Sequence, residues 1–145
     1  MRIVFIGTVE FSYILLKKLI SLNANIVGVC TKEVSNFNTD FYDLTPTCKQ
    51  EDIPYKYVKD INSKENIDWI KDCQADVIFC FGWSNLIKEE LLGLTKDGVI
   101  GYHPSKLPLN RGRHPLIWAL ALGLKKSAST FFFMDKGADT GDIIS

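Results

Sequence analysis

The residues of this chain best suited to catalysis lie in two short motifs of its last third. His103 stands in Gly-Tyr-His-Pro-Ser, residues 101–105, and Asp139 follows 36 residues later in Asp-Lys-Gly-Ala-Asp-Thr-Gly, residues 135–141. An imidazole titrates near neutral pH and can take or give a proton, and a carboxylate can orient it and stabilise its cation. Each motif lies at the end of a predicted strand, and open α/β sheets bind ligands at the carboxyl ends of their strands. We therefore expect an acid–base pair at that edge of a sheet.

Short apolar runs alternate with segments of helical periodicity along the whole chain. The pattern predicts strands at 2–6, 25–30, 53–58, 76–81, 98–102 and 127–134. It predicts helices at 11–20, 47–51, 63–72, 84–92 and 115–124, with Ser84 capping the fourth and Trp118 in the core. Strands that alternate with helices favour right-handed crossovers. The expected fold class is therefore α/β, a Rossmann-like, mainly parallel open sheet with helices on both faces.

Length and composition fit one compact domain. The 145 residues, 46% of them apolar, can bury one core and leave little room for a second. Residues 31–45, rich in Asn, Ser, Thr and Asp, are typical of a surface loop. The apolar residues 143–144 are typical of the start of a further strand, so we expect the domain to be incomplete at its C-terminal end.

The charge of the chain is balanced, with 17 basic and 17 acidic residues. Nucleic-acid binders attract phosphates through excess positive charge, so no nucleic-acid partner is expected. No apolar run approaches the roughly 18 residues of a membrane span, and the N-terminus lacks the pattern of a secretory signal. These features favour a cytoplasmic protein without a membrane partner. The cysteines lack metal-ligand spacing and are interpreted as reduced packing thiols, with no metal site predicted; they are Cys30, Cys48, Cys73 and Cys80.

The motif at residues 101–108 and the later Asp-x-Gly, at this spacing, resemble the folate-dependent formyltransferases, whose members carry Asn-x-His-Pro-Ser-x-Leu-Pro. The resemblance implies that residues 1–145 form a formyltransferase-like N-terminal catalytic domain that uses 10-formyltetrahydrofolate as formyl donor. It implies His103 as general base and Asp139 as its partner.

Gly101 departs from this family, because it occupies the position of the catalytic Asn whose amide stabilises the oxyanion. Losing one such donor lowers turnover by about a hundred- to a thousandfold. The protein could therefore be slow, inactive, or supplied with another donor. The candidates are protonated His103, a backbone N–H, a water molecule or Asn110.

The resemblance also implies binding residues around this pair. Phe81, Gly82 and Trp83 form the wall of a folate site, together with Asp135, Gly137 and Ala138, although the apolar run before Gly82 is by pattern alone an ordinary core strand. On the acceptor side the implied residues are Gly7, Thr8, Pro104, Ser105, Arg111 and Arg113. Gly7 reads equally well as a turn glycine, and the two arginines as a solvated turn.

Three functions remain open for this chain, and they differ in the acceptor and in whether formyl transfer occurs. The run Arg-Gly-Arg-x-Pro-Leu-x-Trp, residues 111–118, is similar to the sugar N-formyltransferases and favours the amino group of a nucleotide-linked sugar, since guanidinium groups bind diphosphates. The alternatives are a methionyl-tRNA formyltransferase and a catalytically impaired folate- or nucleotide-binding relative. A homo-oligomer formed through a missing C-terminal part is compatible with the sequence.

Overall fold

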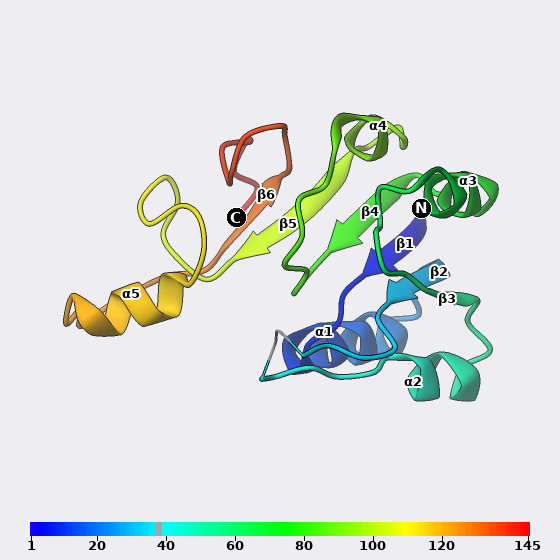
Figure 1. The fold of residues 1–145 in the computed structure, drawn as a ribbon, viewed down its shortest axis with the longest axis horizontal. Helices are drawn as coiled ribbons and strands as arrows, with labels where there is room; N and C mark the ends of the chain where they lie inside the picture. The colour runs from blue at the N-terminus through cyan, green and yellow to red at the C-terminus, as the bar shows by residue number, and fades with distance from the viewer. Residues whose placement is uncertain (37–38) are drawn as a thin grey trace.

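The computed structural model describes residues 1–36 and 39–145 and builds them around one six-stranded sheet (Figure 1). The strands lie in the order β3-β2-β1-β4-β5-β6. Strands β1 to β5 are parallel to one another, and β6 runs antiparallel to β5. Their bounds are β1 Arg2–Ile6, β2 Asn25–Thr31, β3 Tyr55–Tyr57, β4 Val77–Cys80, β5 Val99–His103 and β6 Thr130–Phe133.

Helices cover both faces of this sheet. One face packs against Ile70 of α3 and Leu91 of α4. The other face packs against Leu16 of α1 and Cys48 of α2, next to Phe5 of β1. The predicted α/β fold with a mainly parallel sheet is confirmed. The helix bounds are α1 Glu10–Ser21, α2 Thr45–Gln50, α3 Lys64–Asp72, α4 Glu89–Leu92 and α5 Pro115–Ala121.

Helix α4 is shorter than its sequence pattern predicts. It begins at Glu89 with Lys88 as its cap residue, so the expected cap at Ser84 is wrong. The reason lies on another loop. The amide of Asn62 donates to the carbonyl of Leu86 at 2.9 Å, and its side-chain oxygen accepts from the backbone N–H of Lys88 at 2.7 Å. Because these backbone groups bond to Asn62, residues 84–88 stay irregular.

Helix α5 lies apart from the sheet and from α1 to α4 (Figure 1). None of its seven residues, all of them described, is buried, and Trp118 is 58% exposed. The expectation that Trp118 belongs to the core is wrong. The helix is apolar as predicted, but no described element packs over it.

Strand β6 reverses direction because α5 does not cross a face of the sheet, as a parallel return would require. Thr130, the first residue of β6, pairs with His103, the last residue of β5, so β6 ends beside the start of β5. The chain then doubles back, and the carbonyl of Asp142 accepts from Phe133 N–H at 2.8 Å. The expectation that Asp139 follows a strand ending at the same edge as β5 is wrong. A returning loop carries the carboxylate there instead.

The segment predicted as a surface loop, residues 31–45, starts within β2 and ends within α2, and its residues 37–38 lie outside the described part. Its second half joins the β1–α1 turn. Tyr42 N–H donates to Thr8 O at 3.0 Å, and Glu10 N–H donates to Asp40 O at 2.9 Å. No helix in the described residues is long and apolar enough to cross a membrane.

The four cysteines are free thiols, and three of them are buried. Burial raises the pKa of Cys48 and of Cys80 to about 12. These groups stay protonated at neutral pH, as expected of packing thiols.

Candidate active site

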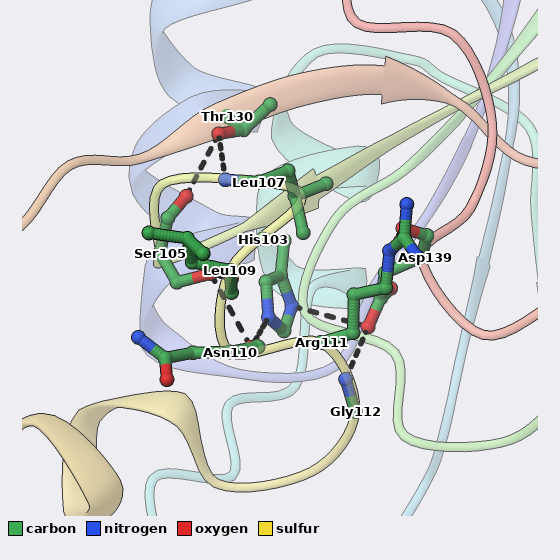
Figure 2. Close-up of polar contacts among 9 residues, drawn as sticks. All are labelled: His103, Ser105, Leu107, Leu109, Asn110, Arg111, Gly112, Thr130 and Asp139. Atoms are coloured by element: carbon green, nitrogen blue, oxygen red, sulfur yellow. Dashed lines mark hydrogen bonds and ion pairs between the residues drawn. The ribbon is translucent and has the colours of Figure 1, made fainter.

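His103 ends β5 and is only 5% exposed. Its Nε2 lies 2.7 Å from the backbone carbonyl oxygen of Asn110 (Figure 2). A carbonyl oxygen can only accept a hydrogen bond, so Nε2 carries a hydrogen in this geometry. The lone pair of the neutral ring is therefore on Nδ1.

Asp139 faces that lone pair. Its Oδ2 lies 3.5 Å from His103 Nδ1 and also accepts the backbone N–H of Gly112 at 2.8 Å. The Nε of Arg111 donates to the backbone carbonyl of Asp139 at 3.0 Å. Residues 110–112 thus hold the imidazole and the carboxylate from one short loop, as Figure 2 shows.

The loop that presents Asp139 is shaped by Asp135. One carboxylate oxygen of Asp135 accepts the hydroxyl of Thr140 at 2.5 Å and the backbone N–H of Gly137 at 2.9 Å. The Thr140 hydroxyl, followed by the Gly137 amide, lowers the pKa of Asp135. A Cβ at Gly137 would overlap Thr140, so glycine is needed there. Asp135 and Gly137 therefore have a structural task, and their expected contact with folate, like that of Ala138, stays a prediction.

Gly101 lies on β5 with its open side filled by two side chains of the neighbouring chain segment. A Cβ at this position would stand 2.8 Å from Met134 Cγ and 3.0 Å from the ring of Phe132. Apolar groups thus occupy the space beside Gly101. The side chain of Asn110, one candidate substitute donor, points away from His103 and Asp139 (Figure 2).

Phe81 is a core residue in this structure. It is buried, and its ring meets Phe5 at 5.8 Å and Phe131 at 5.5 Å between centroids. The burial places its side chain in the core, and the expected contact of Phe81 with folate stays a prediction.

Trp83 remains the better candidate on the folate side. Its ring lies under Lys32 Nζ, 4.9 Å from the centroid, and its buried Nε1 has no hydrogen-bond partner among the described residues. A buried donor of this kind is normally satisfied by a ligand or water. Gly82 beside it has φ +72° and lets the chain turn out of β4.

The β1–α1 turn is tightly packed. A Cβ at Gly7 would collide with Phe81 O and Ser12, so packing alone explains this glycine. Thr8 is fully buried, and its Oγ1 has no partner among the described residues. Acceptor contact by Gly7 or Thr8 stays a prediction.

On the acceptor side, Ser105 is buried, and its hydroxyl donates to Leu109 O at 2.9 Å within its own loop. Pro104 is half-buried, and Arg113 is exposed. The motifs therefore located the reactive pair, but the backbone groups of Asn110 and Gly112 that hold it escaped sequence reasoning. A backbone carbonyl or amide leaves no mark in the residue type.

A family model described as formyl transferase matches residues 1–145. The chain belongs to the formyl transferase family. Among curated relatives of this family, the methionyl-tRNA formyltransferase of Clostridioides difficile is 36% identical over 99% of the chain and 48% of its own length. That of Geobacter sulfurreducens is 32% identical over 99% and 47%. The chain thus spans about half the length of the curated relatives that it matches.

Solved structures of other proteins share the fold. The phosphoribosylglycinamide formyltransferase of Bacillus halodurans aligns with a TM-score of 0.82 at 22% identity, over 100% of this chain and 77% of that one. A formyltetrahydrofolate deformylase from Pseudomonas syringae pv. tomato aligns at 0.80 and 25% identity, over 99% and 49%. The predicted family is confirmed.

Proposed function

We propose that this formyl transferase family member moves a formyl group from 10-formyltetrahydrofolate to a primary amine. The observation that carries the proposal is the buried imidazole of His103 beside the carboxylate of Asp139, with 3.5 Å between Nδ1 and Oδ2. His103 acts as general base, and Asp139 is its partner.

The donor would supply an activated formyl carbon. The residues that fit it best are Trp83, whose buried Nε1 seeks an acceptor, and the backbone of Gly82 at the exit of β4. Both follow a strand that ends at the carboxyl edge of the sheet, where α/β folds bind ligands. The loop at 135–138 completes this side of the proposed site.

The proton of the attacking amine goes to His103. Nδ1 carries the lone pair and accepts it, while Nε2–H stays bonded to the carbonyl of Asn110. The imidazolium then faces Oδ2 of Asp139, and the opposite charge stabilises it in a largely buried site. His103 would return this proton to the folate nitrogen as the bond between that nitrogen and the formyl carbon breaks. Gly112 N–H and Arg111 keep the carboxylate in place during this transfer.

We expect Gly101 to affect the rate. With Phe132 and Met134 against it, the position offers no side-chain donor for the oxyanion. We expect turnover about a hundred- to a thousandfold below that of a relative with Asn here, unless a backbone N–H, a water molecule or protonated His103 supplies that bond.

For the acceptor, we favour a nucleotide-linked amino sugar. The chain is neutral overall, and its loop offers Arg111 and Arg113, of which Arg111 also bonds to Asp139. A second candidate is methionyl-tRNA, because the curated relatives bear that name. We also propose that the protein acts in the cytoplasm.

A direct assay tests both the formyl transfer and the choice of acceptor. The protein is incubated with 10-formyltetrahydrofolate and either nucleotide-linked amino sugars or methionyl-tRNA, and formylated product is measured. Formylation of the sugar alone supports the preferred acceptor, and formylation of methionyl-tRNA alone replaces it with the second. Folate binding by calorimetry without any turnover would identify a binding relative instead.

A further inference from the structure

The loop after β5 contains a buried hydroxyl that the proposed chemistry does not use. Ser105 is 2% exposed and lies two residues after His103. Its Oγ donates to the carbonyl of Leu109 at 2.9 Å and lies 3.3 Å from that of Asn110. One hydroxyl hydrogen is thus shared between two consecutive carbonyl groups.

Ser105 itself is anchored to the sheet. The hydroxyl of Thr130 donates to the backbone carbonyl of Ser105 at 2.7 Å and accepts the N–H of Leu107 at 3.3 Å. Thr130 belongs to β6 and pairs with His103 across the ladder. Figure 2 shows this chain of bonds running from Thr130 through Ser105 to Asn110. Ser105 is therefore fixed relative to the imidazole.

The carbonyl at the end of that chain decides where the single hydrogen of neutral His103 sits. Two acceptors compete for it, the Asn110 carbonyl at Nε2 and the Asp139 carboxylate at Nδ1. The carboxylate is the stronger acceptor, but it lies at 3.5 Å and the carbonyl at 2.7 Å. If the Asn110 carbonyl turned away, the hydrogen would move to Nδ1 and bond to Asp139. Nδ1 could then no longer accept a proton.

We infer that Ser105 is a positioning residue that selects the reactive tautomer of His103. By holding the Asn110 carbonyl in place, it keeps the hydrogen on Nε2 and leaves Nδ1 as the proton acceptor. The consequence for catalysis rests on the proposed function, whereas the effect on the tautomer does not.

The test is nitrogen NMR on protein with 15N-labelled histidine. The chain has two histidines, and His114→Asn assigns their signals. We expect wild-type neutral His103 to be the Nε2–H tautomer and Ser105→Ala to shift it toward Nδ1–H. In the formylation assay, Ser105→Ala should lower kcat by about ten- to a hundredfold with KM nearly unchanged, since misplacement acts on the transition state. Cysteine is a weaker donor of similar size, so Ser105→Cys should have a tautomer population and a kcat between those of wild type and Ser105→Ala.

The matched control is Ser63→Ala. Ser63 caps α3 with a hydrogen bond to Asn66 N–H, so its loss lowers stability without touching the site. The His103 tautomer should stay as in wild type.

An Nδ1–H tautomer in wild type, or an unchanged tautomer in Ser105→Ala, would overturn the inference. If Ser105→Ala does not fold, the His103 tautomers of wild type and of Ser105→Cys test the inference instead. The protein could formylate no amine while Ser105→Ala still shifts the tautomer of His103. That result would overturn the proposed function and leave the role of Ser105 intact.

Discussion

Two stretches of this chain, residues 103–105 and residues 116–124, show opposite relations between polarity and burial. In residues 103–105, at the end of β5 and the start of its loop, the imidazole of His103 and the hydroxyl of Ser105 are buried. In α5 and the residues after it, six large apolar side chains are exposed. They are Leu116, Ile117, Trp118, Leu120, Leu122 and Leu124.

The difference shows that a side chain is buried here when other groups bond to it or pack over it, whatever its hydropathy. The polar groups of His103 and Ser105 are buried because the carbonyls of Leu109 and Asn110 satisfy their hydrogen bonds. The apolar side chains of α5 are exposed because no described element covers that helix.

The largest expected effect concerns the buried imidazole. His103→Ala should lower kcat/KM for formyl transfer by about a hundred- to ten-thousandfold, the usual contribution of a general base. The melting temperature should also fall moderately, because the variant leaves a cavity and an unpaired Asn110 carbonyl. The exposed His114 provides the matched control, and His114→Asn, which tolerates the left-handed backbone at φ +59°, should keep its activity. Unchanged activity with a large loss of stability in His103→Ala would make this residue structural.

A second pair of variants compares the stability contributions of a buried residue of α3 and an exposed residue of α5. Ile70 of α3 is fully buried, and Ile70→Ala should lower the free energy of unfolding by about 2–5 kcal/mol through the lost contacts and the cavity. Leu120 of α5 is 82% exposed, and Leu120→Ala should change it by less than about 0.5 kcal/mol. Urea unfolding measures both. A large loss in Leu120→Ala would mean that α5 is covered in solution.

Sequence reasoning recovered most of the fold because its signals are local. The strand β4 and the helix α3 follow from apolar runs and periodicity between polar turns. It failed where distant groups decide. The start of α4 depends on Asn62, more than twenty positions before the helix, and the direction of β6 depends on where α5 lies. Periodicity identifies a strand but does not give its direction.

The candidate site divides in the same way. His103 and Asp139 could be predicted because their motifs are local and their side chains carry the chemistry. The bonds that hold them come from backbone atoms of Asn110 and Gly112, and nearly every residue type carries such a carbonyl or N–H. The filling of the space beside Gly101 depends on Phe132, a contact across the sheet that no local pattern encodes.

Gly101→Asn tests that filling. The added side chain should be forced against Phe132 and Met134 and should cost about 1–3 kcal/mol of stability, as overpacking does. Turnover should fall rather than rise. Gly123→Asn is the control, because Gly123 has open space around it and a φ of +62° that Asn tolerates. A gain in turnover in Gly101→Asn would show that the site lacks only the amide and can make room for it.

The smallest expected effect is a pH dependence of the loop that presents Asp139. Because the pKa of Asp135 is lowered by Thr140 and Gly137, its carboxylate contributes stability above its unfolded pKa, near 3.8, and loses that contribution as pH falls through the lower folded pKa. Asp135→Asn should therefore be slightly less stable than wild type at pH 7, and the difference should vanish in acid. Thermal unfolding of both proteins between pH 7 and pH 2 measures it. A difference that grows in acid would contradict the assignment.

The doubling back of the chain after β6 also protects the margin of the sheet. The N–H groups of Phe131 and Phe133 point outward from β6, where a free strand would offer them to another protein chain. Here they donate to the carbonyls of Ser145 and Asp142 at 2.7 and 2.8 Å. The opposite margin is β3, with only three residues. The segment that carries Asp139 to His103 therefore also blocks edge-to-edge association at β6, so a variant that loosens this loop should increase aggregation as well as disturb the site.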